Sequence, residues 1–155
     1  MKRAVLVLLA ACIMLGSFPS ALAAKEEARQ ETEFVTYLDD GSYFVTSIRE
    51  EALRASSTLK RGTKVKKLYN SDDELQWLVT LTAVFSYDGT TSTCTSATCS
   101  TTIYENCWGT SSCTSSHSGN TAYGYATFAC RISGIIIDTR NVTVKLTCDE
   151  NGVLS

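Results

Sequence analysis

The sequence predicts an all-β fold: an antiparallel β-sandwich, immunoglobulin-like in architecture, with seven or eight strands. Three observations favour this fold class. β-branched and aromatic residues alternate with polar residues in several segments, turn-forming residues separate those segments, and no sustained helical period is present. Because 44% of the residues are hydrophobic and 19% are charged, the chain has enough apolar surface to bury in one core.

The longest alternating segment, residues 77–87, is the predicted central strand. Trp77, Val79, Leu81 and Phe85 fall on one face of it, since successive side chains of a strand point to opposite faces. Full burial of each such side chain contributes roughly 1.5–3 kcal/mol, so this face should form the centre of the core. Trp77 is therefore interpreted as a structural residue.

Shorter segments on both sides of this strand complete the predicted sandwich. Between residues 90 and 121 the chain is rich in Ser and Thr, with 18 of 32 positions, and Glu105 is its only charge. Residues 49–59 are compatible with a short helix or a linker, and a bulge is expected at residues 138–141. The other predicted strands are residues 34–38 and 43–48, joined by a turn at Gly41, and residues 64–69, 99–104, 114–118, 121–132 and 135–148.

Residues 1–23 have the three parts of a secretory signal peptide. They begin with two basic residues, continue with an apolar run at residues 4–15 and end in Ala-Leu-Ala, a pattern that a signal peptidase reads. We therefore expect a secreted, extracellular protein, with lipid attachment through Cys12 as the alternative. Residues 24–33 are expected to form a mobile N-terminal segment, and residues 34–155 a single β-sandwich domain.

Cysteine usage predicts three disulfides that staple the C-terminal half. An even number of cysteines in an exported chain is typical of a disulfide framework. Zinc is disfavoured, because the spacings are not those of a zinc site and the chain has one histidine. Several connectivities are open, and Cys94–Cys148 is the favoured bond because it joins the hairpin of the central strand to the last strand. The six cysteines are Cys94, Cys99, Cys107, Cys113, Cys130 and Cys148.

Charge and motif content exclude several classes of function. Without the leader the chain keeps 16 acidic and 12 basic residues, a net charge of −4, whereas nucleic-acid binding requires a strongly basic surface. No apolar run of about 20 residues follows the leader, so we expect no integral membrane segment in the mature chain.

Catalytic constellations are missing, so we expect no enzymatic activity, no cofactor and no metal. His117 is the only histidine, and its serine neighbours point away from it on a strand, so it is interpreted as a solvated loop residue. Acidic residues cluster at positions 39–40 and 72–74, where they are typical of turns. A hydrolase that uses His117 or these acid pairs is the disfavoured alternative.

Two features could contact a partner. Trp108 lies in the uncharged segment between Cys107 and Cys113, and it would anchor a binding surface if those cysteines paired and held the ring outward. The alternative is that Trp108 covers a small satellite core beside a disulfide. The second feature is a basic cluster, which could contact anionic cell-wall polymer or lipid, although protection of an exposed edge strand is the favoured interpretation. The basic cluster comprises Lys60, Arg61, Lys64, Lys66 and Lys67.

Turn and strand motifs are spread along the chain as YLDDGSY (residues 37–43), YNSD (69–72), FSYDG (85–89), SGNTA (118–122) and VKLTC (144–148). Over about residues 33–155 they resemble an uncharacterised family of small secreted β-rich proteins from Gram-positive bacteria. This resemblance implies secretion and a β-rich fold, and it implies no activity. It also suggests that Cys94 and Cys148 occupy recurrent family positions, while Cys107 and Cys113 are additions.

We therefore predict a secreted, non-enzymatic recognition or interaction module, whose partner is an extracellular component such as a cell-surface glycan or protein. The nearly uncharged Ser/Thr surface on a rigid scaffold favours this function. The alternative from another class is a secreted toxin or antimicrobial protein that acts on membranes. The basic cluster and the threonine-rich strands favour that alternative.

Overall fold

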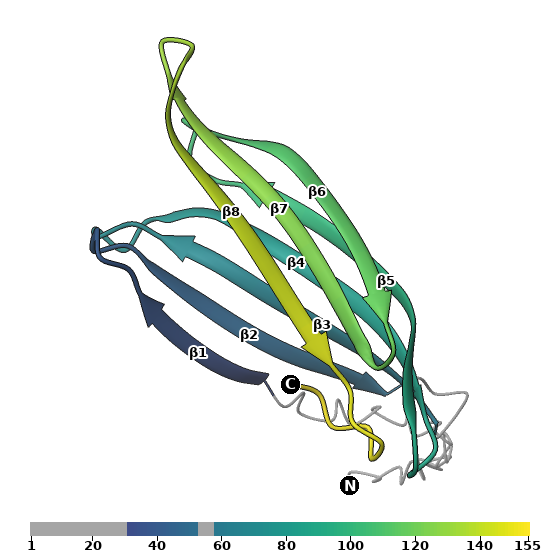
Figure 1. Cartoon of the computed structure of the whole chain (residues 1–155). Helices are drawn as coiled ribbons and strands as arrows, with labels where there is room; N and C mark the ends of the chain where they lie inside the picture. Colours follow the sequence, from purple (N-terminus) through teal and green to yellow (C-terminus); the bar gives the residue numbers. More distant parts are fainter. Residues whose placement is uncertain (1–30, 53–57) are drawn as a thin grey trace, which may run out of the picture.

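The computed structural model describes residues 31–52 and 58–155, which form eight antiparallel strands in two sheets (Figure 1). The order is β1-β2-β3-β4-β5 in the larger sheet and β6-β7-β8 in the smaller one, so each strand pairs with its neighbour in the chain. The strands are β1 (Glu31–Tyr37), β2 (Tyr43–Ala52), β3 (Leu59–Tyr69), β4 (Leu75–Tyr87), β5 (Ser92–Ile103), β6 (Trp108–Ser118), β7 (Thr121–Ile132) and β8 (Ile135–Thr147).

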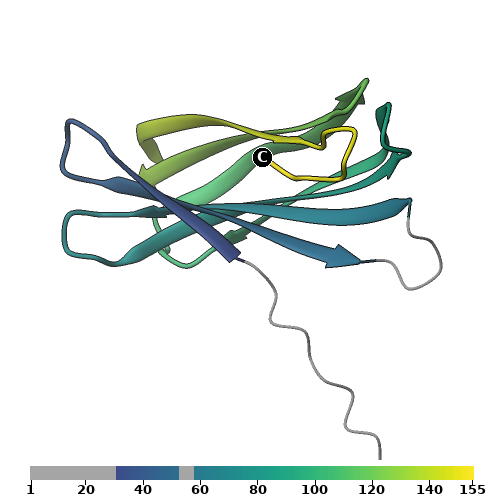
Figure 2. The same ribbon diagram turned by 90° about the horizontal axis from the view of Figure 1, so that it is seen from below.

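The two sheets face each other as the layers of a sandwich, which Figure 2 shows from below. This arrangement confirms the predicted all-β fold class and the predicted number of strands. Both sheets are meanders, whereas immunoglobulin domains have Greek-key connections. The likeness to immunoglobulin domains is therefore one of architecture and does not extend to strand order.

Several element boundaries differ from those that the sequence predicts. β1 begins at Glu31, three residues early, because its pairing with β2 continues as far as Arg49. β2 runs to Ala52, so residues 49–52 form a strand and not the start of a helix. The rest of that predicted helix or linker, residues 53–57, lies outside the described residues. So do the predicted signal peptide and residues 24–30 of the predicted N-terminal segment.

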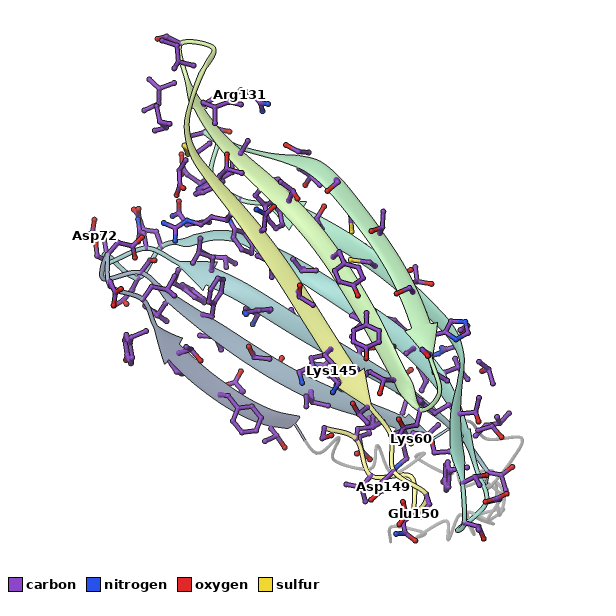
Figure 3. The ribbon with its side chains drawn as sticks, viewed as in Figure 1. Lys60, Asp72, Arg131, Lys145, Asp149 and Glu150 are labelled. Atoms are coloured by element: carbon purple, nitrogen blue, oxygen red, sulfur yellow. A yellow bond between two sulfur atoms is a disulfide. The ribbon has the colours of Figure 1, made fainter. Side chains whose placement is uncertain are left out.

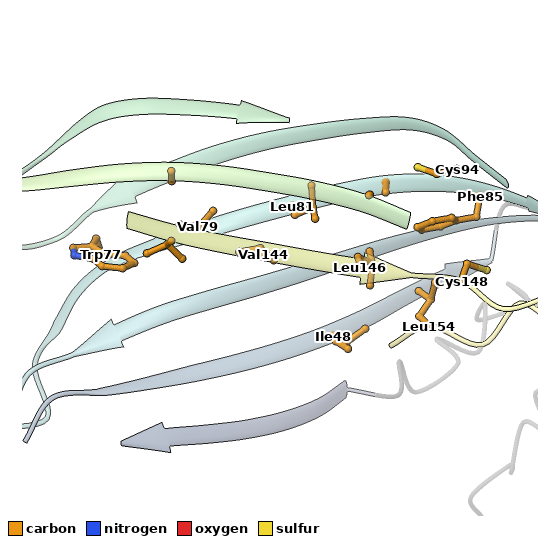
Figure 4. Close-up of a cluster of buried hydrophobic side chains, with 14 of the residues drawn as sticks. Ile48, Trp77, Val79, Leu81, Phe85, Cys94, Val144, Leu146, Cys148 and Leu154 are labelled. Atoms are coloured by element: carbon orange, nitrogen blue, oxygen red, sulfur yellow. The ribbon is translucent and has the colours of Figure 1, made fainter. Parts of the chain in front are cut away.

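The inner face of β4 forms the centre of the core, as predicted (Figure 4). Trp77, Val79, Leu81 and Phe85 are fully buried and Ala83 of the same face is buried too, while Leu78, Thr80, Thr82 and Val84 on the other face are partly exposed. The Trp77 ring stacks on Phe128 of β7, with ring centroids 3.9 Å apart and planes 12° apart. This contact joins the larger sheet to the smaller one, since β4 and β7 belong to different sheets.

The larger sheet extends beyond the sheet that covers it. β4 packs against all three strands of the smaller sheet, whereas no Cα atom of β1 or β2 comes within 8 Å of one in β6, β7 or β8. Figure 1 shows β1 and β2 lying beyond β8. We call the inner side of this part of the larger sheet the uncovered face. By strand register it comprises Thr32, Phe34 and Thr36 of β1 and Phe44, Thr46, Ile48 and Glu50 of β2, and we include their neighbours Lys64 and Lys66 on β3, a strand that also contacts β8.

The C-terminal segment after β8 folds back over one end of this face. Leu154 forms an isolated β-bridge with Cys148, and Ser155 exchanges backbone hydrogen bonds with Thr147. Beneath the segment, a Cβ atom at Gly62 of β3 would lie 2.5 Å from Leu154 Cδ1 and 2.9 Å from Leu146 Cδ2. The close approach of these leucines to β3 therefore requires glycine at position 62.

Trp77→Ala is expected to lower the free energy of unfolding by about 3–5 kcal/mol, because it removes a fully buried ring that contacts both sheets. Urea denaturation of the purified protein measures the change. Tyr37→Ala, which removes a ring that is 75% exposed, is the control and should cost about 1 kcal/mol or less. Parental stability of the Trp77→Ala protein would contradict this description of the core.

Gly62→Ala is expected to destabilise the fold by about 1–3 kcal/mol, since the added methyl group overpacks the contact with Leu146 and Leu154. Gly109→Ala is the matched control, because a Cβ atom there would come no closer than 3.7 Å to another residue. Thermal melting compares the two variants. Equal melting temperatures would show that the C-terminal segment does not pack on β3 as described.

Candidate functional site

The structure does not group His117 with the acidic residues that a hydrolase would require, although the two acidic groups lie in neighbouring turns, since a Cβ atom at Gly41 would lie 3.5 Å from Ser71 Cβ. His117 is exposed near the end of β6, where its backbone pairs with Ala122. Asp40 lies in the β1–β2 turn, where it accepts hydrogen bonds from the amide and hydroxyl groups of Ser42 and pairs with Arg140 Nη2 at 2.5 Å. These contacts with Ser42 and Arg140 hold the pKa of Asp40 well below its usual range.

The second acidic group, at residues 72–74, also serves a turn. Asn70 Oδ1 accepts hydrogen bonds from the amides of Asp72 and Glu74, and the Tyr43 hydroxyl donates to Asp73 at 2.9 Å, which raises the pKa of Tyr43. In residues 31–52 and 58–155 no three His, Cys, Asp or Glu side chains are grouped as a metal site. The same residues include no helix long and apolar enough to cross a membrane.

Trp108 is partly buried and packs against the edge of the hydrophobic core. Its ring meets Trp77 edge to face, with centroids 6.1 Å apart, and its Nε1–H donates to Gln76 Oε1 at 3.2 Å. Cys107, the residue before it, is bonded to Cys130 and not to Cys113. The loop that would have held the indole outward is therefore not formed, and the half-buried position matches the alternative of a ring that covers core residues.

The basic cluster does not protect a sheet edge, so that interpretation is wrong. β3 is the third of five strands and pairs with both β2 and β4. Alternation along β3 sends Lys60, Lys64 and Lys66 to the inner face, while Arg61 and Lys67 lie on the outer face. The sequence pattern alone could not reveal this division, because it depends on where β3 lies in the sheet.

Lys64 and Lys66 are cations of the uncovered face. Lys60, the third lysine on this side of β3, has its Nζ atom 3.0 Å from Glu50 Oε2. Lys64 and Lys66 form no ion pair with any residue that the structure describes. Both side chains are partly buried, which leaves two positive charges near the sandwich interior without a described counter-ion.

Burial and neighbouring positive charges both act on these lysines. Burial lowers the pKa of both side chains, and the charges of Lys145 and Lys66 lower that of Lys64 further. Lys145 comes from β8, on the other sheet (Figure 3). Lys66 Nζ lies 4.2 Å from the centroid of the Phe44 ring, a cation–π contact that does not neutralise its charge.

A cavity of about 360 Å³ opens on the uncovered face beside Lys64. Its apolar walls come from three parts of the chain: β1, β2 and the C-terminal segment. Glu50, an acidic side chain that lines it, is already paired with Lys60, whereas Lys64 has no ion-pair partner among the described residues. The lining residues are Thr32, Phe34, Ile48, Glu50, Lys64, Val153, Leu154 and Ser155.

Cysteine positions only partly match the predicted framework. Cys107 and Cys130 form a disulfide, with Cα atoms 4.7 Å apart, that links the start of β6 to β7. Cys113 donates a hydrogen bond to Cys99, with Sγ atoms 2.8 Å apart, and this contact joins β6 to β5. Burial and the contact with Cys113 raise the pKa of Cys99 to about 12.

The favoured bond between Cys94 and Cys148 is not formed in this structure. Both are buried thiols, and burial raises the pKa of each. Their backbone amides bind the same β6–β7 turn: that of Cys94 donates to Gly119 O, and that of Cys148 to Asn120 O. The pairing of these two cysteines stays a prediction.

The chain matches no protein-family model, no curated protein and no solved structure. The resemblance to an uncharacterised family of small secreted β-rich proteins therefore stays a prediction. Secretion does too, since the leader lies outside the described residues.

Protein isolated after export without reductant is expected to hold three disulfides: Cys107–Cys130, Cys99–Cys113 and Cys94–Cys148. The second follows from the short Sγ–Sγ distance, and an oxidising compartment supplies the disulfide exchange that forms it. Mass spectrometry of unreduced peptides identifies the pairs. A free thiol at Cys99, or Cys113 bonded elsewhere, would contradict the predicted link between β5 and β6.

Proposed function

We propose that this protein is a secreted, non-enzymatic recognition module whose ligand carries an anionic group on an apolar body. The observation that carries the proposal is the pair Lys64 and Lys66 on the uncovered face. Neither forms an ion pair with a described residue. Lys64 lines an apolar cavity, and Lys66 follows two residues later on the same face of β3. We therefore propose that the predicted cell-surface partner carries a carboxylate or phosphate attached to an apolar group.

Electrostatics at the uncovered face favour such a ligand. A partly buried lysine without a counter-ion loses hydration that no protein group replaces, and this cost falls when an anion binds. Lys145 reinforces the attraction from the opposite sheet. The ion pair between Glu50 and Lys60 neutralises the acidic side chain that lines the cavity, so an entering anion meets little repulsion from Glu50.

The shape of the cavity favours an apolar body behind the charged group. Phe34, Ile48, Val153 and Leu154 supply apolar walls, and Thr32 supplies a hydroxyl group. Apolar walls with a few polar groups are typical of small-molecule sites. Phe34 and Val153 are 54% and 58% exposed, so a ligand that covered them would gain free energy from their burial.

Binding of the anionic fluorophore 1-anilinonaphthalene-8-sulfonate to the folded protein, and its displacement by decanoate, tests the proposal. A Lys64→Gln and Lys66→Gln double variant should bind decanoate at least about tenfold more weakly, since close charge pairs at a binding site carry this much free energy. Lys67→Gln, on the outer face of the same strand, is the matched control and should bind as the parent does.

Two controls make the result decisive. All variants should melt as cooperatively as the parent, so that fluorophore binding reports the native cavity. Decanol should displace the fluorophore less well than decanoate, because it lacks the anionic group. Equal affinity of the parent and the double variant for decanoate, or equal displacement by decanol, would refute the proposed function.

A further inference from the structure

The tip of the β7–β8 hairpin carries an exposed apolar group that nothing in the sandwich covers. We call it the isoleucine tip and define it as Ile132, Ile135, Ile136 and Ile137 together with the turn Ser133–Gly134. The isoleucines are 57%, 68%, 53% and 57% exposed, respectively. Figure 1 shows this hairpin extending beyond the body of the sandwich, and Figure 3 places Arg131 on it. We propose that the isoleucine tip docks the protein on an anionic lipid bilayer.

Strand register makes the tip apolar on both faces. Ile132 pairs with Ile135 across the turn, so their side chains share one face of the hairpin. Ile136 pairs with Arg131 on the opposite face, and Ile137 stands at the bulge, without a partner in the register. A flat protein surface can cover one face of such a hairpin. The hydrocarbon region of a bilayer surrounds an inserted tip and covers both.

The tip lies outside the part of β8 that belongs to the core. Further along β8, Val142, Val144 and Leu146 are buried against the larger sheet. The isoleucines come before this region. Monomeric proteins rarely expose several adjacent large apolar side chains unless these bind a partner or a membrane. Packing inside the sandwich therefore does not account for four adjacent isoleucine side chains.

A rigid turn presents the isoleucines. Ser133 and Gly134 have φ angles of 51° and 82°, which are typical of the tight turns that match the twist of a two-stranded hairpin. The strands remain paired up to Ile132 and Ile135. Little conformational entropy would therefore be lost when the tip enters an apolar environment.

Charge near the tip favours an anionic bilayer over a neutral one. Arg131 is exposed beside Ile136 and forms no ion pair with a described residue. Asp138, the acid that follows the tip, is held 2.7 Å from Arg140 Nε. With the isoleucines inserted into the hydrocarbon region, Arg131 would lie near the level of the lipid phosphates, where a cation is attracted.

Sedimentation with vesicles tests the proposal on the full mature protein. Vesicles of phosphatidylglycerol and phosphatidylcholine should bind the parent at low salt, and a triple variant, Ile132→Thr, Ile135→Thr and Ile136→Thr, should bind at least tenfold more weakly. Threonine retains the β-branched shape, so the hairpin should still fold. Val35→Thr, at an exposed strand residue away from the tip, is the control and should bind as the parent does.

Two further measurements separate the alternatives. Arg131→Gln should weaken binding to the anionic vesicles and leave binding to pure phosphatidylcholine unchanged. Fluorescence of an Ile135→Trp variant should shift to shorter wavelength on the anionic vesicles. No vesicle binding by the parent, or equal binding by the triple variant, would overturn the proposal. So would an oligomer in solution that the triple variant dissociates, since the tip would then contact a second copy of the chain.

The bilayer proposal is independent of the proposed ligand site. The isoleucine tip and the cavity share no residue, and the cavity is lined by β1, β2, β3 and the C-terminal segment. Loss of decanoate binding in the Lys64 and Lys66 variant would thus leave vesicle binding unchanged, and failure of either proposal can be recognised separately.

Discussion

Stacking of Trp77 on Phe128 fixes the position of the two sheets relative to each other. Phe44 from β2 and Trp108 from β6 contact the same indole, with ring centroids 5.9 Å and 6.1 Å from it. This cluster draws on four strands, two from each sheet. Because it holds the middle strand of the smaller sheet over β4, three strands cannot cover all five, and no Cα atom of β1 or β2 comes within 8 Å of the smaller sheet.

The proposed site exists because the five-stranded sheet is wider than the three-stranded sheet that covers it. If the smaller sheet had a fourth strand beyond β8, Lys64 and Lys66 would be enclosed without a counter-ion, at a large cost in free energy. Beside an open face they remain in partial contact with water. The C-terminal segment then closes one end of the face and forms the cavity. Lysines at these positions are thus compatible with folding only because the sandwich is incomplete.

Local pattern predicted the elements well where large apolar residues alternate with polar ones. The buried face of β4 and the hairpin of β7 and β8 were predicted correctly, with the bulge at Ile137, one residue before its expected place. In the Ser/Thr-rich region the predicted strands were too short, because serine and threonine give little contrast between the two faces. β5 and β6 nevertheless extend over Ser92–Ile103 and Trp108–Ser118.

Features that depend on contacts between distant segments could not be predicted. The sequence identified the basic cluster but not its division between two faces, which requires the position of β3 in the sheet. The sequence identified Trp108 as a candidate binding residue, but its contacts with Trp77 and Gln76 could not be predicted. The role of the last residues in lining a cavity had no sequence signal, since Val153 and Leu154 follow a turn and belong to no strand of either sheet.

The central claim is that Lys64 and Lys66 form an anion-binding site on the uncovered face. Its most direct test is a titration of the lysine side chains by NMR, in the free protein and with decanoate bound. The account predicts that both lysines have pKa values below that of an ordinary lysine in the free protein, as burial requires, and that decanoate raises both while leaving Lys67 unchanged. Unchanged pKa values of Lys64 and Lys66 in the presence of saturating decanoate would contradict it.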